Sequence, residues 1–161
     1  MYANAQDEID DEFAEQDKGG FPYATPVRED VGVLLACARR KTRDYLLLRL
    51  LYAAGLRRQE VASLLVADLI WEAGCILIRA SKRDKDRYVL VDRVTMEMLR
   101  QWVGDAPPER SLFEMGVDNV SRLFRAWANQ SGLYAKYQEQ KLSLSPHSAA
   151  RLCHPQLREW P

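Results

Sequence analysis

The sequence has little of several features that would assign it to a class at once. Its three cysteines, Cys37, Cys75 and Cys153, are odd in number and widely spaced, which argues against a disulfide framework and against a zinc site. Its richest apolar run, residues 45–56, contains Arg49 and is shorter than the ~20 residues that a membrane span needs. The N-terminus shows neither the basic nor the apolar segment of a secretory signal. We therefore expect a cytoplasmic protein that has no membrane partner and binds no metal.

Neither positive nor negative charge is in excess over the whole chain, but the two signs are unevenly distributed along it. The chain of 161 residues has 23 basic and 23 acidic side chains. Residues 1–20 contain seven acidic residues and one lysine, a net charge of −6, which leaves +6 for the remainder. This composition predicts an acidic, disordered tail over residues 1–24 and a basic domain suited to a polyanionic partner. A solvated tail without a function would have the same composition.

The chain has no internal repeat, and its length suits one domain. Apolar residues at helical spacing predict helices over 28–40, from 42 to a stop at Gly55, over 58–64, over 94–103, and from 118 to near Gly132. Alternation and β-branched residues predict short strands near 69–71, 75–79 and 88–91. A polar linker and a new helix start at Ser145-Pro146 would follow. The predicted fold class is mostly α with a small antiparallel β-sheet or hairpin, an α+β domain.

The first candidate site is the segment GLRRQE, residues 55–60. Arg57 falls in the joint between two predicted helices, where a planar guanidinium can hold two oxygens of one phosphate. Glu60 lies one helical turn further on and could fix that arginine. Arg58 directly follows Arg57 as a second arginine. A surface arginine paired with its own glutamate three residues later would give the same pattern.

The second candidate is the charged hairpin tip within RASKRDKDRY, residues 79–88. It carries Lys82, Arg83, Lys85 and Arg87. A lysine on a hairpin can enter a DNA groove and deliver a proton to a leaving oxygen. Charged residues also protect exposed strand edges from pairing, so the hairpin alone does not decide between these functions.

The third candidate is the segment SPH, residues 145–147. His147 would stand at the start of a helix, where free N–H groups attract an anion, and its imidazole can exchange a proton near neutral pH. A structural or surface histidine would look the same in isolation.

Taken in order, these motifs identify a family. The run LLYAAGLRRQEVASLLVADL, the hairpin SKRDKDR, then SLF and SPH resemble the catalytic domain of the tyrosine recombinases, the phage integrase family. The resemblance extends from Arg28 to Ser148, and it implies the corresponding fold and double-stranded DNA as partner, with other recombinase protomers as further partners.

The resemblance also implies roles for individual residues. Arg57 would grip the scissile phosphate, Glu60 would support it, Lys82 would be the hairpin lysine although Ser81 replaces the usual glycine, and His147 would open the H-x-L-R-H box. Members of the family perform site-specific recombination or integration through a 3′-phosphotyrosyl intermediate, without a metal or a nucleotide cofactor. Arg58, Arg83, Lys85 and Arg87 would contact DNA.

The sequence departs from the family pattern directly after His147. The second arginine is expected where Ala150 stands, and Arg151 is one position late, which turns a helical side chain by ~100°. The next histidine or tryptophan and the tyrosine nucleophile are also missing from the printed sequence. The predicted organisation is a tail (1–24), a partial catalytic domain (25–148) and an aberrant C-terminal tail (149–161). We expect the chain alone to be catalytically incomplete.

The codons for the last residues suggest a cause. Read one nucleotide later from Ala149, they permit R-H-x-F-A-T-H-x-x-x-N-G, which resembles the family's continuation. We hypothesise that a deletion of two nucleotides, or an equivalent sequencing error, removed the expected leucine after Ser148, which the nucleotide sequence of the gene's 3′ end would test. Two alternatives stand beside an incomplete recombinase: a non-catalytic DNA-binding regulator or partner of an intact recombinase on the same scaffold, and an unrelated α-rich interaction domain.

Overall fold

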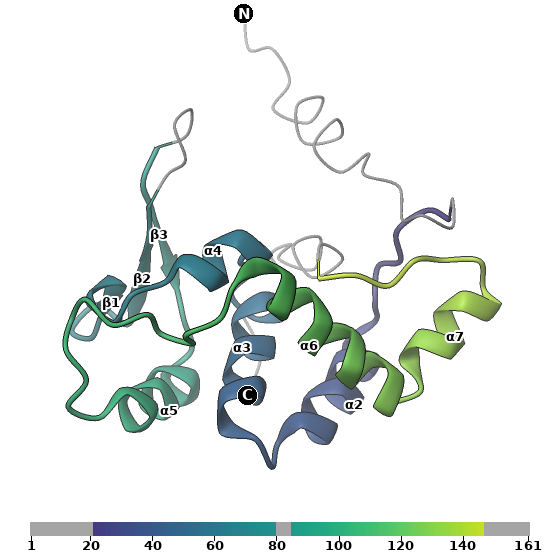
Figure 1. Ribbon diagram of the computed structural model, residues 1–161, viewed down its shortest axis with the longest axis horizontal. Coiled ribbons are helices and arrows are strands. Elements are labelled where there is room, and N and C mark those ends of the chain that lie inside the picture. Colours follow the sequence, from purple (N-terminus) through teal and green to yellow (C-terminus); the bar gives the residue numbers. More distant parts are fainter. Residues whose placement is uncertain (1–20, 80–84, 147–161) are drawn as a thin grey trace, which may run out of the picture.

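The computed structural model describes residues 21–79 and 85–146 (Figure 1). Its elements are, in chain order, α2 (Arg28–Ala38), α3 (Thr42–Tyr52), α4 (Arg58–Ser63), the 3-10 turn η1 (Val66–Asp68), β1 (Leu69–Ile70), β2 (Cys75–Ile78), β3 (Arg87–Leu90), α5 (Arg93–Val103), α6 (Val117–Gln130) and α7 (Leu133–Glu139). Helices dominate and one small sheet is inserted between α4 and α5. The predicted fold class is therefore confirmed.

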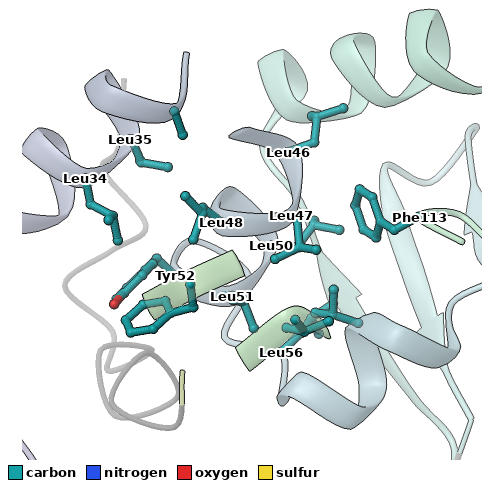
Figure 2. Close-up of a cluster of buried hydrophobic side chains, with 14 of the residues drawn as sticks. Leu34, Leu35, Leu46, Leu47, Leu48, Leu50, Leu51, Tyr52, Leu56 and Phe113 are labelled. Carbon is teal, nitrogen blue, oxygen red and sulfur yellow. The ribbon is translucent and has the colours of Figure 1, made fainter. Parts of the chain in front are cut away.

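Helix α3 forms the centre of the core. Five of its leucines have no solvent exposure, namely Leu46, Leu47, Leu48, Leu50 and Leu51. Figure 2 shows these side chains between Leu34 and Leu35 of α2 on one side and Phe113 on the other. A helix that is apolar on nearly all its faces must be surrounded by other elements, so the buried helix predicted from the apolar run is confirmed.

The sheet has three antiparallel strands in the order β1-β2-β3. Cys75 pairs with Leu90 and Ile78 pairs with Arg87 across β2 and β3. Ile76 and Ile78 of β2 are buried, whereas three of the four residues of β3 are exposed. In Figure 1 the β2–β3 hairpin extends away from the helices beside α4. The hairpin therefore rests on the helical part through β2, with β3 at its edge.

Several helix ends follow the signals in the sequence. Asp92 is the N-cap of α5, and its carboxylate accepts a hydrogen bond from the Thr95 N–H at 2.9 Å. Gly104 follows the last turn of α5 with φ of 51°. Gly132 lies between α6 and α7 with φ of 77°, a left-handed conformation that costs glycine little.

Helix α7 corrects the sequence prediction, which made the segment after Gly132 a polar linker. Leu133 and Tyr137, four residues apart, are buried on one face of this seven-residue helix. The Tyr137 hydroxyl donates a hydrogen bond to Asp30 of α2 at 2.6 Å, and the Lys136 ammonium contacts the same carboxylate at 2.8 Å. The helix is therefore fixed in part by contacts with Asp30 of α2, a residue far away in the sequence that the segment itself does not reveal.

Residues 22–24, just before the predicted domain start at residue 25, already pair with the domain. The Ala24 N–H donates to the Ser143 carbonyl at 2.7 Å, and the Ser143 N–H donates to the Pro22 carbonyl at 2.8 Å. Ala24 is only 1% exposed. Residues 1–20 and 147–161 lie outside the described residues, so the predicted tails and their boundaries stay predictions. Within the described residues, no helix is both long enough and apolar enough to cross a membrane.

Candidate functional site

The turn after α3 determines where Arg57 lies. Gly55 has φ of 64°, and this left-handed conformation turns the chain away from the helical path after α3. Leu56 follows with no solvent exposure, and its N–H donates to the Leu50 carbonyl at 3.2 Å. Because Leu56 is buried in the core, Arg57, the next residue, lies at the domain surface. Arg57 is half-buried there and is the N-cap of α4, with an extended backbone.

Glu60 connects the start of α4 with the hairpin. Its Oε2 accepts a hydrogen bond from the Arg57 backbone N–H at 2.8 Å. The same carboxylate binds the Arg87 guanidinium with both oxygens, Nη1 to Oε1 at 2.7 Å and Nη2 to Oε2 at 2.9 Å. This is the two-pronged geometry in which arginine and carboxylate interact most strongly. The sequence prediction that Glu60 supports the Arg57 side chain stays a prediction, whereas the contact of Glu60 with β3 is a finding of the structure.

A second carboxylate holds the other strand of the hairpin. Arg79, which directly follows β2, places its Nε 2.8 Å from Asp68. The Asp68 side chain is nearly buried and also accepts the Leu65 N–H at 2.9 Å. The two strands that lead into and out of residues 80–84 are thus each attached to the helical part of the domain.

The remaining predicted site residues divide into two groups. Lys85 is exposed and lies two residues before the start of β3, and Arg58 donates from Nη1 to Ser121 of α6 at 3.3 Å. Lys82, Arg83 and His147 lie outside the described residues. The expectation that Arg57, Lys82 and His147 meet at one phosphate therefore stays a prediction. Among the described residues, no group of three or more histidine, cysteine or acidic side chains is arranged to hold a metal ion.

A buried arginine behind the hairpin was not recognised as important in the sequence. Arg49 of α3 donates to Thr95 Oγ1 at 2.6 Å, to Asp92 at 3.1 Å and to the Tyr45 hydroxyl at 3.1 Å. Burial raises the pKa of Asp92, but hydrogen bonds from Thr95 and the charge of Arg49 outweigh burial and hold that pKa below its usual value. This network fixes the chain just after β3 ends. A charged residue inside an apolar run was the signal in the sequence.

The surroundings of Tyr137 do not suit a nucleophile. Its side chain is buried and hydrogen-bonded to Asp30. Burial, together with that contact, raises the pKa of Tyr137 to about 12. A nucleophile needs the opposite change, toward easier deprotonation. Tyr137 therefore has a structural role between α2 and α7.

The described residues also form a shallow cavity of about 330 Å³ between η1, β1 and α5. Trp71 and Arg100 are in its wall, with the guanidinium carbon 4.9 Å from the ring centre. None of the predicted site residues lines this cavity.

Comparison with known proteins places the chain in a family. The sequence profile of the phage integrase family matches residues 28–154, and the chain belongs to this family. The relatives it resembles are tyrosine recombinases. It is 34% identical over 101 residues to tyrosine recombinase XerA of Saccharolobus solfataricus, covering 63% of this chain and 34% of that protein. It is 30% identical over 125 residues to a tyrosine recombinase of Pseudothermotoga lettingae, covering 74% and 41%.

The fold agrees with this assignment. A crystal structure of XerA recombinase superposes with a TM-score of 0.63 at 19% identity, covering 80% of this chain and 47% of that one. The family resemblance drawn from the motifs is thereby confirmed, and the alternative of an unrelated α-rich interaction domain is wrong. The chain spans about one third to two fifths of the length of the first two curated relatives.

Proposed function

We propose that this chain provides the phosphate-binding part of a tyrosine recombinase active site and binds double-stranded DNA in the cytoplasm, with other recombinase protomers as further partners. The observation that carries this proposal is the Glu60 carboxylate, which joins the backbone of Arg57 to Arg87 on the hairpin. It brings together the two segments that, in the family pattern, contribute the first arginine and the lysine.

The chemistry follows from the charges that develop on a phosphodiester during strand exchange. Arg57 would neutralise charge on the non-bridging oxygens, and Lys82 and His147 would move protons to and from the departing and attacking oxygens. The family reaction forms a 3′-phosphotyrosyl link and then resolves it by attack of another strand. It needs no metal ion or nucleotide, because the residues themselves supply charge and protons.

The printed sequence has an alanine at position 150, where the family pattern has its second arginine. Loss of one preorganised donor costs a factor of about 10² to 10³ in rate. We therefore expect the 161-residue chain, tested alone, to bind DNA without cleaving it. The appearance of a covalent protein–DNA product with a nicked substrate would contradict this part of the proposal.

DNA binding is tested by fluorescence anisotropy with a short labelled duplex over a series of salt concentrations. We expect the affinity of the wild-type chain to fall steeply between about 50 and 200 mM salt. Arg57→Ala should weaken binding more than Arg110→Ala, which removes the same charge from an exposed ion pair with Glu114. Binding that is absent, or that does not depend on salt, would contradict the proposal.

A second function keeps the scaffold but not the chemistry: a regulator that occupies recombination sites or pairs with an intact recombinase. Ala150 is the observation in its favour. This function requires DNA affinity that survives Arg57→Ala and still falls with salt, because contacts spread over the basic surface would then suffice. The anisotropy series distinguishes the two functions directly.

A further inference from the structure

The position of β3 is not determined by burial. Among the described residues β3 pairs with β2 alone. Tyr88 is 69% and Leu90 is 78% exposed, and only Val89 of this strand is even partly buried. A strand with so little apolar burial gains little from the hydrophobic effect. Other interactions must therefore hold it against the helical part of the domain.

Charged contacts are present at both ends of β3. At its first residue, Arg87 binds Glu60 of α4 with both of its terminal nitrogens. Just beyond its last residue, Asp92 binds the buried Arg49 of α3 at 3.1 Å. The Glu60 side chain is 13% exposed, so its contact is better shielded from water than a typical surface ion pair.

We propose that Arg87 is a positioning residue, which holds β3 beside the start of α4, and that it does not contact DNA phosphate as its place in the charged hairpin predicted. This inference rests on the proposed function, because the segment that Arg87 positions carries Lys85 and follows Lys82, the lysine that the family pattern assigns to the hairpin. The two oxygens of Glu60 already occupy the terminal nitrogens of Arg87.

The pair also controls the charge around Arg57. Glu60 lies next to Arg57 through a backbone hydrogen bond of 2.8 Å. Without Arg87, its negative charge would repel an incoming phosphate and attract the Arg57 guanidinium. Arg87 compensates that charge, so the start of α4 keeps a positive potential toward DNA.

The geometry requires an arginine at position 87. A lysine carries the same charge but has a single nitrogen, and it cannot form two parallel contacts with one carboxylate. At a phosphate contact, in contrast, lysine is a good replacement for arginine. Arg87→Lys therefore separates positioning from phosphate binding while the net charge of the protein is unchanged.

The first measurement uses no DNA. Amide hydrogen exchange of residues 85–90 is compared in the wild-type chain, Arg87→Lys, Glu60→Gln and two controls. Lys85→Ala removes an exposed neighbouring charge, and Arg110→Lys changes an arginine of the same type in the loop between α5 and α6. We expect exchange in this segment to accelerate about two- to fivefold in Arg87→Lys and Glu60→Gln, as for loss of a half-exposed ion pair, and to stay at the wild-type rate in both controls. Wild-type exchange in Arg87→Lys would overturn the inference.

The second measurement is DNA affinity as a function of salt, at a temperature at which circular dichroism shows every variant to be folded. We expect Arg87→Lys and Glu60→Gln to weaken binding of the labelled duplex about two- to fivefold without changing the salt dependence. Lys85→Ala should lower the slope of log K against log salt by about 0.9, as for one lost phosphate contact. If Arg87 bound phosphate, Arg87→Lys would bind like the wild type and Glu60→Gln would bind more tightly. That result would overturn the inference.

Failure of the proposed function can be told apart from failure of this inference. If the wild-type chain shows no salt-dependent binding, the DNA function is contradicted. The exchange rates then decide by themselves whether Arg87 holds β3. If binding is present but the exchange rates of Arg87→Lys are those of the wild type, only the positioning role is contradicted.

Discussion

The most demanding prediction concerns Arg49, a charged side chain inside the apolar core. Its side chain is 6% exposed, and it pairs with Asp92, whose side chain is 26% exposed. In Arg49→Met the methionine side chain fills the space of the apolar part of the arginine, but Asp92 and Thr95 lose a charged hydrogen-bond donor. Removing one partner of a buried ion pair typically costs about 3–5 kcal/mol. Because Asp92 still reaches water and keeps its contact with the Thr95 N–H, we expect a loss near the lower limit, about 3 kcal/mol.

The assay is urea unfolding followed by tryptophan fluorescence, with a double-mutant cycle. Asp92→Asn keeps an N-cap for α5, since asparagine caps nearly as well as aspartate, but it removes the charge. If the pair is coupled, Arg49→Met should cost at least about 1 kcal/mol less in the Asp92→Asn background than alone. Additivity within about 0.5 kcal/mol would refute the argument, because the two residues would then act independently.

The same variant has a predictable pH dependence. Asp92 has a folded pKa below its unfolded value of 3.8, so its contribution to stability is present above about pH 4 and is lost as the pH falls through the lower folded value. In Arg49→Met one of the causes of this lowering is removed. The free energy of unfolding should then fall less between pH 5 and pH 3 than it does in the wild-type chain. An acid profile parallel to that of the wild type would contradict this expectation.

Three further changes test separate parts of the fold and the site. Tyr137→Phe should make the loss of stability at alkaline pH shallower. The wild-type tyrosine has its pKa raised from 10.0 to about 12, so it contributes stability below pH 10 that is lost between pH 10 and pH 12. The free energy of unfolding measured across this pH range checks the expectation, and identical profiles of the variant and the wild type would contradict it. Leu47→Ala removes a fully buried side chain of α3 and should cost about 2–5 kcal/mol in urea unfolding, whereas a loss below about 1 kcal/mol would mean that the core is not centred on α3. Gly55→Ala places a side chain at φ of 64° and should cost about 1–2 kcal/mol. Because Gly55 determines where Arg57 lies, it should also weaken DNA binding, and wild-type affinity would contradict the link.

The elements that the sequence predicts well are those with local signals. The period of α3, the N-cap at Asp92 and the glycine after α5 each act within one or two turns of a helix. Their positions could be read from the chain with small errors at the ends. Helix α7 lacked such signals, because only Leu133 and Tyr137 of its seven residues are buried and because Tyr137 bonds to Asp30, which is 107 positions away in the sequence.

The candidate site shows the same division. The motif around Arg57 was recognisable, and the support of the Arg57 side chain by Glu60 stays a prediction. The contact between Glu60 and Arg87 was not, because the two residues are 27 positions apart and a charged hairpin is equally compatible with DNA contacts and with edge protection. Pairing across such a distance depends on how the sheet packs on the helices, which no local pattern encodes. The convergence of Arg57, Lys82 and His147 stays a prediction.

The bonds between Ser143 and residues 22–24 have a consequence for protein engineering. Because residues 22–24 lie directly beside Ser143, a linker between residues 146 and 21 could close the described domain into a ring. New chain ends introduced in a surface loop elsewhere would then give a circularly permuted chain with the same arrangement of helices and strands. Likewise, a host protein would need only one insertion point to display the whole unit.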